Sequence, residues 1–314
     1  MRPGESSLSD MAQQQRNRNR NQRGQQRSRK RRTGGAERRV AGLATLPPPE
    51  GPLLGIDEER ARNDRWGIVA AVVIGVVIGP IAGLVALPLN VWAALAVGIL
   101  TGVLAAIAVP RAAIFGAVRL VSGAPVELSS VPRVATLLEG LCATFGVAQP
   151  ELSILPDPVR NAAIVARKGQ TTLVLTTGLV TDLTLVEMEG VLAHLLARQR
   201  LAAVHRSTLG AGLAIILGPI GRRPGVAHRL TGRAGLFRAD EIAAVTVRYP
   251  TGLAGALGSM VQGPLPSEGS MFSSSVYAAT RWLFIDPSIG RRTPEEEQGD
   301  VDATSVRRAA LEEW

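Results

Sequence analysis

Two long runs without a charged residue dominate the hydropathy pattern of this chain. Residues 66–89 read WGIVAAVVIGVVIGPIAGLVALPL, and residues 91–109 read VWAALAVGILTGVLAAIAV. An α-helix needs about 20 apolar residues to cross the hydrocarbon core of a bilayer, and both runs meet this length. We therefore predict two transmembrane helices within residues 66–110, joined by a short turn at Pro88 and Asn90.

A buried hairpin within a soluble protein is the alternative, and the flanking residues favour the membrane hairpin. Trp66 and Trp92 stand near the starts of the two runs, where interfacial aromatic residues are common. Arginines flank the outer ends of both runs and are absent from the turn; they are Arg60, Arg62, Arg65, Arg111 and Arg119. Because positively charged flanks remain in the cytoplasm, we predict a multi-pass protein of the cytoplasmic membrane with both ends in the cytoplasm.

The region before the hairpin, residues 1–65, is rich in arginine. Residues 13–32 read QQQRNRNRNQRGQQRSRKRR and contain no aliphatic or aromatic residue, so they have nothing to bury. We predict a disordered cytoplasmic tail and linker, with the acidic run 57–59 in the linker. The formal net charge of +9 comes largely from this tail. Binding of anionic lipid is one function for it; binding of RNA or DNA without sequence preference and a solvated tail that only sets topology are the alternatives.

The remaining region, residues 111–314, has the pattern of a mixed α+β domain. Apolar residues recur at helical spacing between 134 and 145, which predicts an amphipathic helix. Three short apolar or β-branched runs predict strands at 151–155, 162–166 and 172–176. Thr184 and Glu187 form a capping-box pattern that opens a helix extending to about 201, and another helix is expected at about 238–247. The apolar segment 209–220 is too short to span a bilayer, so we expect it to dip into the membrane or to form a buried hairpin arm.

Composition excludes several classes of site. Cys142 is the only cysteine, which excludes an intramolecular disulfide and a zinc site built from several thiolates and suits a reducing cytoplasm. It lies on the apolar face of its predicted helix, so we expect it in the core. No histidine–aspartate arrangement accompanies the serines at 273–275, and no phosphate-binding glycine motif follows a strand. Lysine is nearly absent while alanine, valine, leucine, glycine and arginine dominate, a bias typical of a GC-rich bacterial genome.

Several short motifs occur in an order that is fairly specific when they are taken together. Residues 189–194 read EGVLAH on a predicted helix, and Ala239-Asp240 lies on a later one, followed by PTGL at 250–253. The strands contribute Asn161-Ala162 and TTGL at 176–179. This series resembles the HtpX-type membrane zinc metalloproteases, relatives of the CAAX prenyl protease, and residues 286–288 and 306–308 are similar to weakened C-terminal elements of that family. The resemblance covers about residue 131 to the C-terminus and implies a zincin-like metalloprotease-type domain behind the transmembrane hairpin.

The departures from the family's pattern concern its zinc site. In that family the helix carries HExxH, in which two histidines bind zinc and the glutamate activates the attacking water; a later glutamate, four residues before an Ala-Asp aspartate, is the third ligand. Here His194 stands at the first ligand position, but Leu195 replaces the glutamate and Arg198 replaces the second histidine. Leu236, four residues before Asp240, replaces the third ligand. We therefore expect no zinc and no other cofactor, because one imidazole is too few ligands and the cation of Arg198 repels the metal.

Three functions remain open at this point. The first is a pseudoprotease that binds or regulates other membrane proteins or unfolded peptides, with a peptide-binding edge strand at Asn161, Ala162, Ala163 and Ile164. The second is an active zinc-dependent metalloendopeptidase with a non-standard ligand set. The third is a membrane-tethered protein that binds lipid or nucleic acid through the arginine-rich tail. The missing glutamate and ligands favour the first.

The basic residues of the candidate site also carry expectations. Arg198 is expected to replace the metal by pairing with Asp240 or Glu241 on the facing helix; the alternative is that its side chain reaches solvent. We expect His194 to be a structural residue. His205 and His228 lie in basic, loop-like surroundings and are expected to be solvated.

Overall fold

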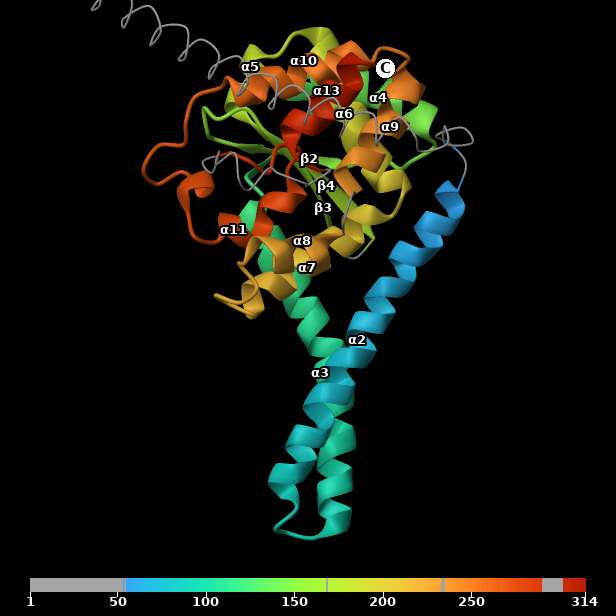
Figure 1. The fold of residues 1–314 in the computed structure, drawn as a ribbon, viewed down its shortest axis with the longest axis vertical. Coiled ribbons are helices and arrows are strands. Elements are labelled where there is room, and N and C mark those ends of the chain that lie inside the picture. The colour runs from blue at the N-terminus through green and yellow to red at the C-terminus, as the bar shows by residue number, and fades with distance from the viewer. Residues whose placement is uncertain (1–52, 54, 168, 233–234, 290–301) are drawn as a thin grey trace, which may run out of the picture. The chain divides into compact units, whose positions relative to one another are not determined.

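The computed structural model describes residues 53, 55–167, 169–232, 235–289 and 302–314 of the chain. Almost all of them belong to one compact unit, Gly55–Trp314, in which helices and one sheet are mixed and helices predominate (Figure 1). This confirms the mixed helix and sheet prediction, whereas the zincin-like assignment stays a prediction. The predicted disordered tail lies almost wholly outside the described residues.

Two long apolar helices, α2 (Ile56–Ala86) and α3 (Val91–Val121), occupy the predicted hairpin. Only 6% of the apolar window of α2 and 17% of that of α3 are buried within the structure, so they are not the core of a soluble domain. The turn between them ends where the Asn90 side chain accepts a hydrogen bond from the Ala93 amide at 2.7 Å. Both helices extend beyond the predicted spans. The acidic run 57–59, predicted as linker, instead forms the first turn of α2, where carboxylates favour the helix dipole.

Small residues allow α2 and α3 to approach each other closely. Gly75, Gly79 and Gly83 of α2 face Gly98 and Gly102 of α3. A Cβ atom added at Gly79 would lie only 2.8 Å from the backbone oxygen of Gly98. Such close backbone contacts are typical of helix pairs in membranes, where van der Waals packing rather than hydrophobic burial drives association.

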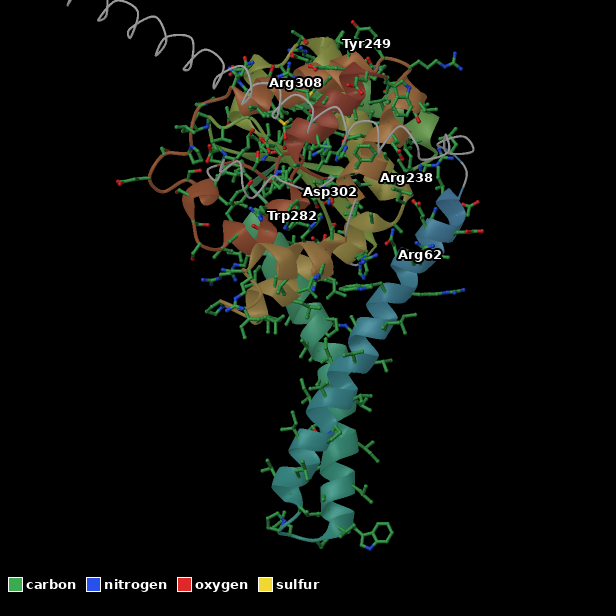
Figure 2. The ribbon with its side chains drawn as sticks, viewed as in Figure 1. Arg62, Arg238, Tyr249, Trp282, Asp302 and Arg308 are labelled. Atoms are coloured by element: carbon green, nitrogen blue, oxygen red, sulfur yellow. The ribbon has the colours of Figure 1, made fainter. Side chains whose placement is uncertain are left out.

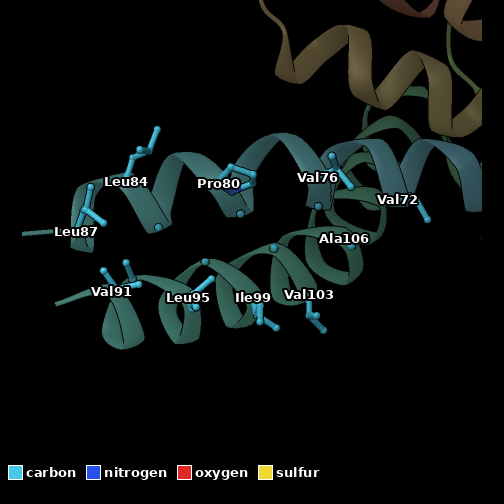
Figure 3. Close-up of a pocket in the computed structure, with 16 residues that line it drawn as sticks. Val72, Val76, Pro80, Leu84, Leu87, Val91, Leu95, Ile99, Val103 and Ala106 are labelled. Atoms are coloured by element: carbon cyan, nitrogen blue, oxygen red, sulfur yellow. The ribbon is translucent and has the colours of Figure 1, made fainter.

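An apolar groove of about 700 Å³ runs along the same hairpin (Figure 3). Side chains of both helices line it, with Pro80 and Leu84 on α2 and Leu95, Ile99 and Val103 on α3. These large side chains are exposed in the described part of the chain. In a bilayer the groove is therefore open to lipid tails or to another transmembrane segment.

The four-stranded sheet has the order β1-β2-β4-β3. Its strands are β1 (Ala124–Val126), β2 (Glu151–Leu155), β3 (Ala162–Arg167) and β4 (Gln170–Thr176). β2 and β4 are parallel, whereas β3 pairs with β4 and β1 pairs with β2 in antiparallel fashion. The three predicted strands are confirmed. β1 was missed because three residues are too few to show an alternating pattern.

The helix α6 (Leu185–Arg200) forms the centre of the domain. Its predicted capping box is present: the Thr184 amide donates to Glu187 Oε2 at 2.9 Å, and the Glu187 amide donates to Thr184 Oγ1 at 3.4 Å. α6 packs against α4 (Pro132–Phe145), α9 (Gly235–Val247) and α10 (Pro250–Val261). Cys142 is buried in the same core, as predicted.

The ambiguous apolar segment 209–220 is mostly the second half of α7 (Ala203–Ile216). Residues 209–212 of the segment are buried, and a Cβ atom added at Gly212 would lie 2.0 Å from the backbone oxygen of Ala113 in α3. α7 also contacts α2 and β3, so this part of the segment is a buried arm. Ile216, Leu217 and Ile220 follow at its end and are exposed.

Shorter elements complete the described chain. They are α5 (Thr177–Asp182), α8 (Pro224–Thr231), α11 (Tyr277–Thr280), α13 (Thr304–Glu312) and the 3₁₀ turns η1 (Leu128–Ser130), η2 (Met271–Ser273) and η3 (Arg281–Leu283). α13 packs against α10 and α9. The C-terminal helix thereby reaches the helices that carry the candidate site.

Substitution of Gly79 by alanine tests the close approach of α2 and α3. We expect Gly79→Ala to destabilise the detergent-solubilised protein by about 1–3 kcal/mol, because the new methyl group meets backbone that cannot yield easily. Gly116→Ala is the matched control, since nothing lies within 4 Å of a Cβ atom there. Thermal unfolding measures both. A midpoint for Gly79→Ala equal to or above that of Gly116→Ala would contradict the packing described.

Candidate functional site

His194 of α6 and Asp240 of α9 meet in the core, a contact that the sequence analysis did not predict. The distance from His194 Nδ1 to Asp240 Oδ1 is 2.6 Å, and both side chains are buried. Burial lowers the pKa of His194 to about 4 although the Asp240 carboxylate opposes the shift. The ring is therefore neutral near pH 7, with Nδ1–H donating to the carboxylate. Its Nε2 atom is buried and has no hydrogen-bond partner among the described residues.

Arg307 of α13 supplies the charge that balances Asp240. Its Nε donates to Asp240 Oδ2 at 2.5 Å and its Nη2 donates to Oδ1 at 2.9 Å, so the contact is bidentate. Burial alone would raise the pKa of Asp240, but the Arg307 guanidinium and the bond from His194 hold that pKa below its ordinary value. Asp240 thus joins α6, α9 and α13 through two charge-assisted contacts.

Arg198 does not make the contact that was predicted for it. Its Nη1 donates to the Leu283 carbonyl at 2.6 Å, and its Nη2 donates to the Trp282 carbonyl at 3.2 Å and to Ser207 Oγ at 3.3 Å. Asp240 is already taken by Arg307, and Glu241 pairs with Arg238 at 3.0 Å. The prediction of a pair with Asp240 or Glu241 is therefore wrong.

The solvent alternative for Arg198 is wrong as well, because its side chain is only 2% exposed. Burial, followed by the positive charge of nearby Arg307, lowers the pKa of Arg198 to about 10. The guanidinium remains charged at neutral pH. Carbonyl oxygens at the end of η3 are the groups that stabilise this charge in the core.

The donor set around His194 does not fit a zinc ion. Leu195 and Leu236 are buried in apolar clusters, and neither side chain can bind a metal. His194 can supply one ligand atom, Nε2, whereas a catalytic zinc site needs three protein ligands. The described residues contain no group of three or more histidine, cysteine, aspartate or glutamate side chains that could hold a metal.

A second histidine–aspartate pair lies near the first and was not predicted. His228 Nε2 is 2.8 Å from Asp302 Oδ2, and the imidazole stacks on the Trp282 ring with centroids 4.1 Å apart. Figure 2 labels Trp282 and Asp302. Asp302 Oδ1 also accepts hydrogen bonds from the Leu236 and Phe237 amides at 3.1 and 2.9 Å, which caps the start of α9. The prediction that His228 is solvated is wrong, while His205 is exposed as expected.

The predicted peptide-binding residues Asn161, Ala162, Ala163 and Ile164 lie at the outer edge of the sheet, in and just before β3, and all four are buried. The chain itself covers this edge. The Ile285 amide donates to the Ala162 carbonyl at 2.9 Å, and Ala163 forms a β-bridge with Phe284. The side chain of Asn161 donates from Nδ2 to the backbone carbonyl of Asp286 at 2.8 Å, and its Oδ1 accepts from the backbone amide of Asp286 at 3.2 Å. A peptide therefore has to displace residues 284–286 before it can pair with this end of β3, and the peptide-binding role stays a prediction.

Comparison with known proteins places the chain in context. It is 34% identical to a protease HtpX homolog of Halobacterium salinarum over 102 residues, covering 32% of this chain and 35% of that protein. It is 29% identical to a protease HtpX homolog of Dictyoglomus turgidum over 160 residues, which cover 40% of this chain and 53% of that protein. It is 28% identical to a protease HtpX homolog of Tropheryma whipplei over 176 residues, which cover 45% of this chain and 60% of that protein. The chain thus spans about a third to three fifths of the length of these relatives. No family model matches it, and no solved structure matches it significantly.

The two apolar helices and these relatives together indicate a membrane protein that is related to a protease family. The relatives share one description, and the chain accordingly has an HtpX-like family relationship. The resemblance that was inferred for the chain from about residue 131 to the C-terminus is confirmed as a family relationship.

Removal of the charge at Asp240 tests its position at the junction of three helices. We expect Asp240→Asn to destabilise the domain by roughly 3–5 kcal/mol, because Arg307 is then a buried cation without its partner. Glu241→Gln is the matched control on the same helix; its pair with Arg238 is partly exposed and is worth about 0–1 kcal/mol. Chemical unfolding in detergent measures both. Equal losses for the two variants would contradict the description of the junction.

Acidification tests the buried, neutral His194. In the unfolded chain its pKa is 6.5, whereas in the folded chain it is about 4. Between these values the unfolded state binds a proton that the folded state does not, so stability falls as the pH drops from 6.5 towards 4. We expect His194 to contribute a loss of about 2–3 kcal/mol between pH 7.5 and 4.5. His194→Gln, which cannot titrate, should reduce the pH dependence by that amount; an unchanged slope would contradict the assignment.

Proposed function

We propose that this protein is a membrane-anchored, HtpX-like pseudoprotease with a zincin-like domain that lacks the zinc site, and that it acts by binding or regulating other membrane proteins. One observation carries the proposal. Around the buried imidazole of His194, the positions of the other two ligands are held by Arg198 and Leu236, and the position of the general base is held by Leu195.

Each of these replacements removes a different part of the chemistry. Leucine cannot accept a proton from water, so Leu195 cannot generate the attacking hydroxide. Leu236 offers no lone pair to a metal. Arg198 brings a fixed positive charge into a buried site that already contains the cation of Arg307, which opposes a dication at this place. No other group of donors in the described part of the chain compensates for them.

The residues that remain have a structural role in this proposal. Asp240 connects α6 and α13 through His194 and Arg307, and this connection takes the place of a metal that would join α6 and α9. The domain can then hold the family's scaffold without a cofactor. Such a scaffold is suited to binding, because a bound segment is retained and not cleaved.

The apolar groove along α2 and α3 supports a binding role within the membrane. It encloses about 700 Å³ and is lined by exposed side chains of both helices (Figure 3). Gly79 and Gly98 also border the groove at the point where α2 and α3 approach each other closely. We propose a transmembrane segment of a partner protein as the occupant. We also propose that both ends of the hairpin lie in the cytoplasm, because the flanking arginines are confined to those ends.

Two assays on the full chain test this function together. In the first assay, the protein is incubated with an unfolded protein substrate. We expect no cleavage that a zinc chelator can inhibit. In native membranes, a photo-crosslinking residue at Ile99, which lines the groove, should give discrete protein adducts. The same residue at Leu100 is the matched control, since Leu100 is exposed but does not line the groove; it should give lipid adducts only. Chelator-sensitive cleavage, or identical adducts at both positions, would contradict the proposal.

A further inference from the structure

A separate pocket lies where the hairpin meets the domain. It encloses about 330 Å³ between the start of α2, the start of α7 and the start of α9. Figure 2 labels Arg62 on α2 and Arg238 on α9, which line it from two sides. The other side chains used below are Glu59, Asn63, Arg206 and Glu241. None of these residues belongs to the site around His194.

The charges in this pocket are not balanced. Arg238 is paired with two carboxylates, Glu59 at 3.3 Å and Glu241 at 3.0 Å. Arg62 and Arg206 form no ion pair with any carboxylate among the described residues. Three guanidinium groups and two carboxylates thus line the pocket, which leaves one positive charge in excess and two arginines without a carboxylate partner. A bound anion would neutralise this excess charge.

The Arg206 guanidinium keeps one donor atom without a partner. Its Nη1 donates to Asn63 Oδ1 at 3.1 Å, but its Nε atom is buried without a hydrogen-bond partner among the described residues. Burial and then the charge of Arg62 lower the pKa of Arg206 below its ordinary value. Two like charges are thus held near each other across a pocket, an arrangement that a bound anion stabilises.

The pocket lies at the start of the apolar part of α2. The Arg206 guanidinium carbon is 5.4 Å from the ring centroid of Trp66, the first residue of the uncharged run. Tryptophan at such a position marks the boundary between hydrocarbon and headgroups. The pocket therefore opens at the level of the lipid phosphates, beside the span and not deep in the domain.

We propose that this pocket binds the phosphate of an anionic phospholipid headgroup, which Arg62 and Arg206 hold from α2 and α7. Guanidinium groups bind phosphate oxygens through paired, charge-assisted hydrogen bonds. Trp66 lies beside the glycerol region of the same lipid. The bound lipid ties α2 to α7 at the membrane boundary and stabilises the joint between hairpin and domain.

Lipid-dependent unfolding of the full chain in a neutral detergent tests this site. Short-chain phosphatidylglycerol should raise the melting temperature of the wild-type protein, since a ligand that binds only the folded state stabilises it. Short-chain phosphatidylcholine and inorganic phosphate at equal concentration should not. In Arg62→Gln/Arg206→Gln the apparent affinity for phosphatidylglycerol should fall at least about ten-fold, a value typical of one lost charge-assisted contact.

Arg60→Gln is the matched control. Arg60 is an exposed arginine two residues from Arg62 on α2 that does not line the pocket, and all variants keep the arginine-rich tail. We expect this variant to respond to phosphatidylglycerol as the wild type does. Arg62→Gln alone changes an exposed side chain, so its fold is preserved, and it should weaken the response.

Three results would overturn the site. The first is full protection of the double variant by phosphatidylglycerol, and the second is equal protection of the wild type by phosphatidylcholine. The third is equal protection by inorganic phosphate, which would assign the pocket to a soluble phosphate compound. Each shift is measured against the same variant without lipid, so a change in basal stability does not affect the comparison.

Discussion

The buried carboxylate of Asp240 is the group on which the centre of the domain depends. It accepts bonds from His194 on α6 and from Arg307 on α13, and it lies on α9. A buried carboxylate is costly unless its charge is matched and its oxygens are hydrogen-bonded, and both conditions are met here. The packing of the three helices follows from this requirement. The neutral state of His194 follows from its own burial, which outweighs the attraction of the carboxylate.

The same region also contains the contacts that cover the edge strand β3. Residues 282–286 form a short segment whose carbonyls are held by two buried arginines: Arg198 binds those of Trp282 and Leu283, and Arg307 binds that of Ile285. The other side of the segment pairs with Asn161 and Ala162. Arg198, which stands where the resemblance implies the second zinc-binding histidine, therefore helps to hold the chain that covers β3. In the proposed function, the replacement of this ligand by Arg198 and the covering of the sheet edge therefore involve the same side chain.

Several helices, the hairpin and three strands could be predicted from the sequence pattern. The contacts between residues that are distant in sequence could not. Charge-free runs predicted the hairpin, and the Thr184–Glu187 pattern predicted the start of α6. The contact of His194 with Asp240 was not predicted, because Arg198 was expected to be the partner of that carboxylate. Arg307 was not assigned to Asp240, because 67 residues separate them and no periodicity reports such a pair. His228 was misjudged for the same reason, since its partner Asp302 is distant in sequence. The start of α2 was placed too late because acidic residues resemble a linker until the helix dipole is considered.

Zinc content tests the central claim most directly: the domain is held by Asp240 and its two partners without a metal. Elemental mass spectrometry of the detergent-purified full chain gives the zinc bound per protein, with His194→Ala as the control. We expect zinc well below one per chain, with no change in the control. Near-stoichiometric zinc that disappears in His194→Ala would contradict it, because His194 would then be one ligand of a functional metal site.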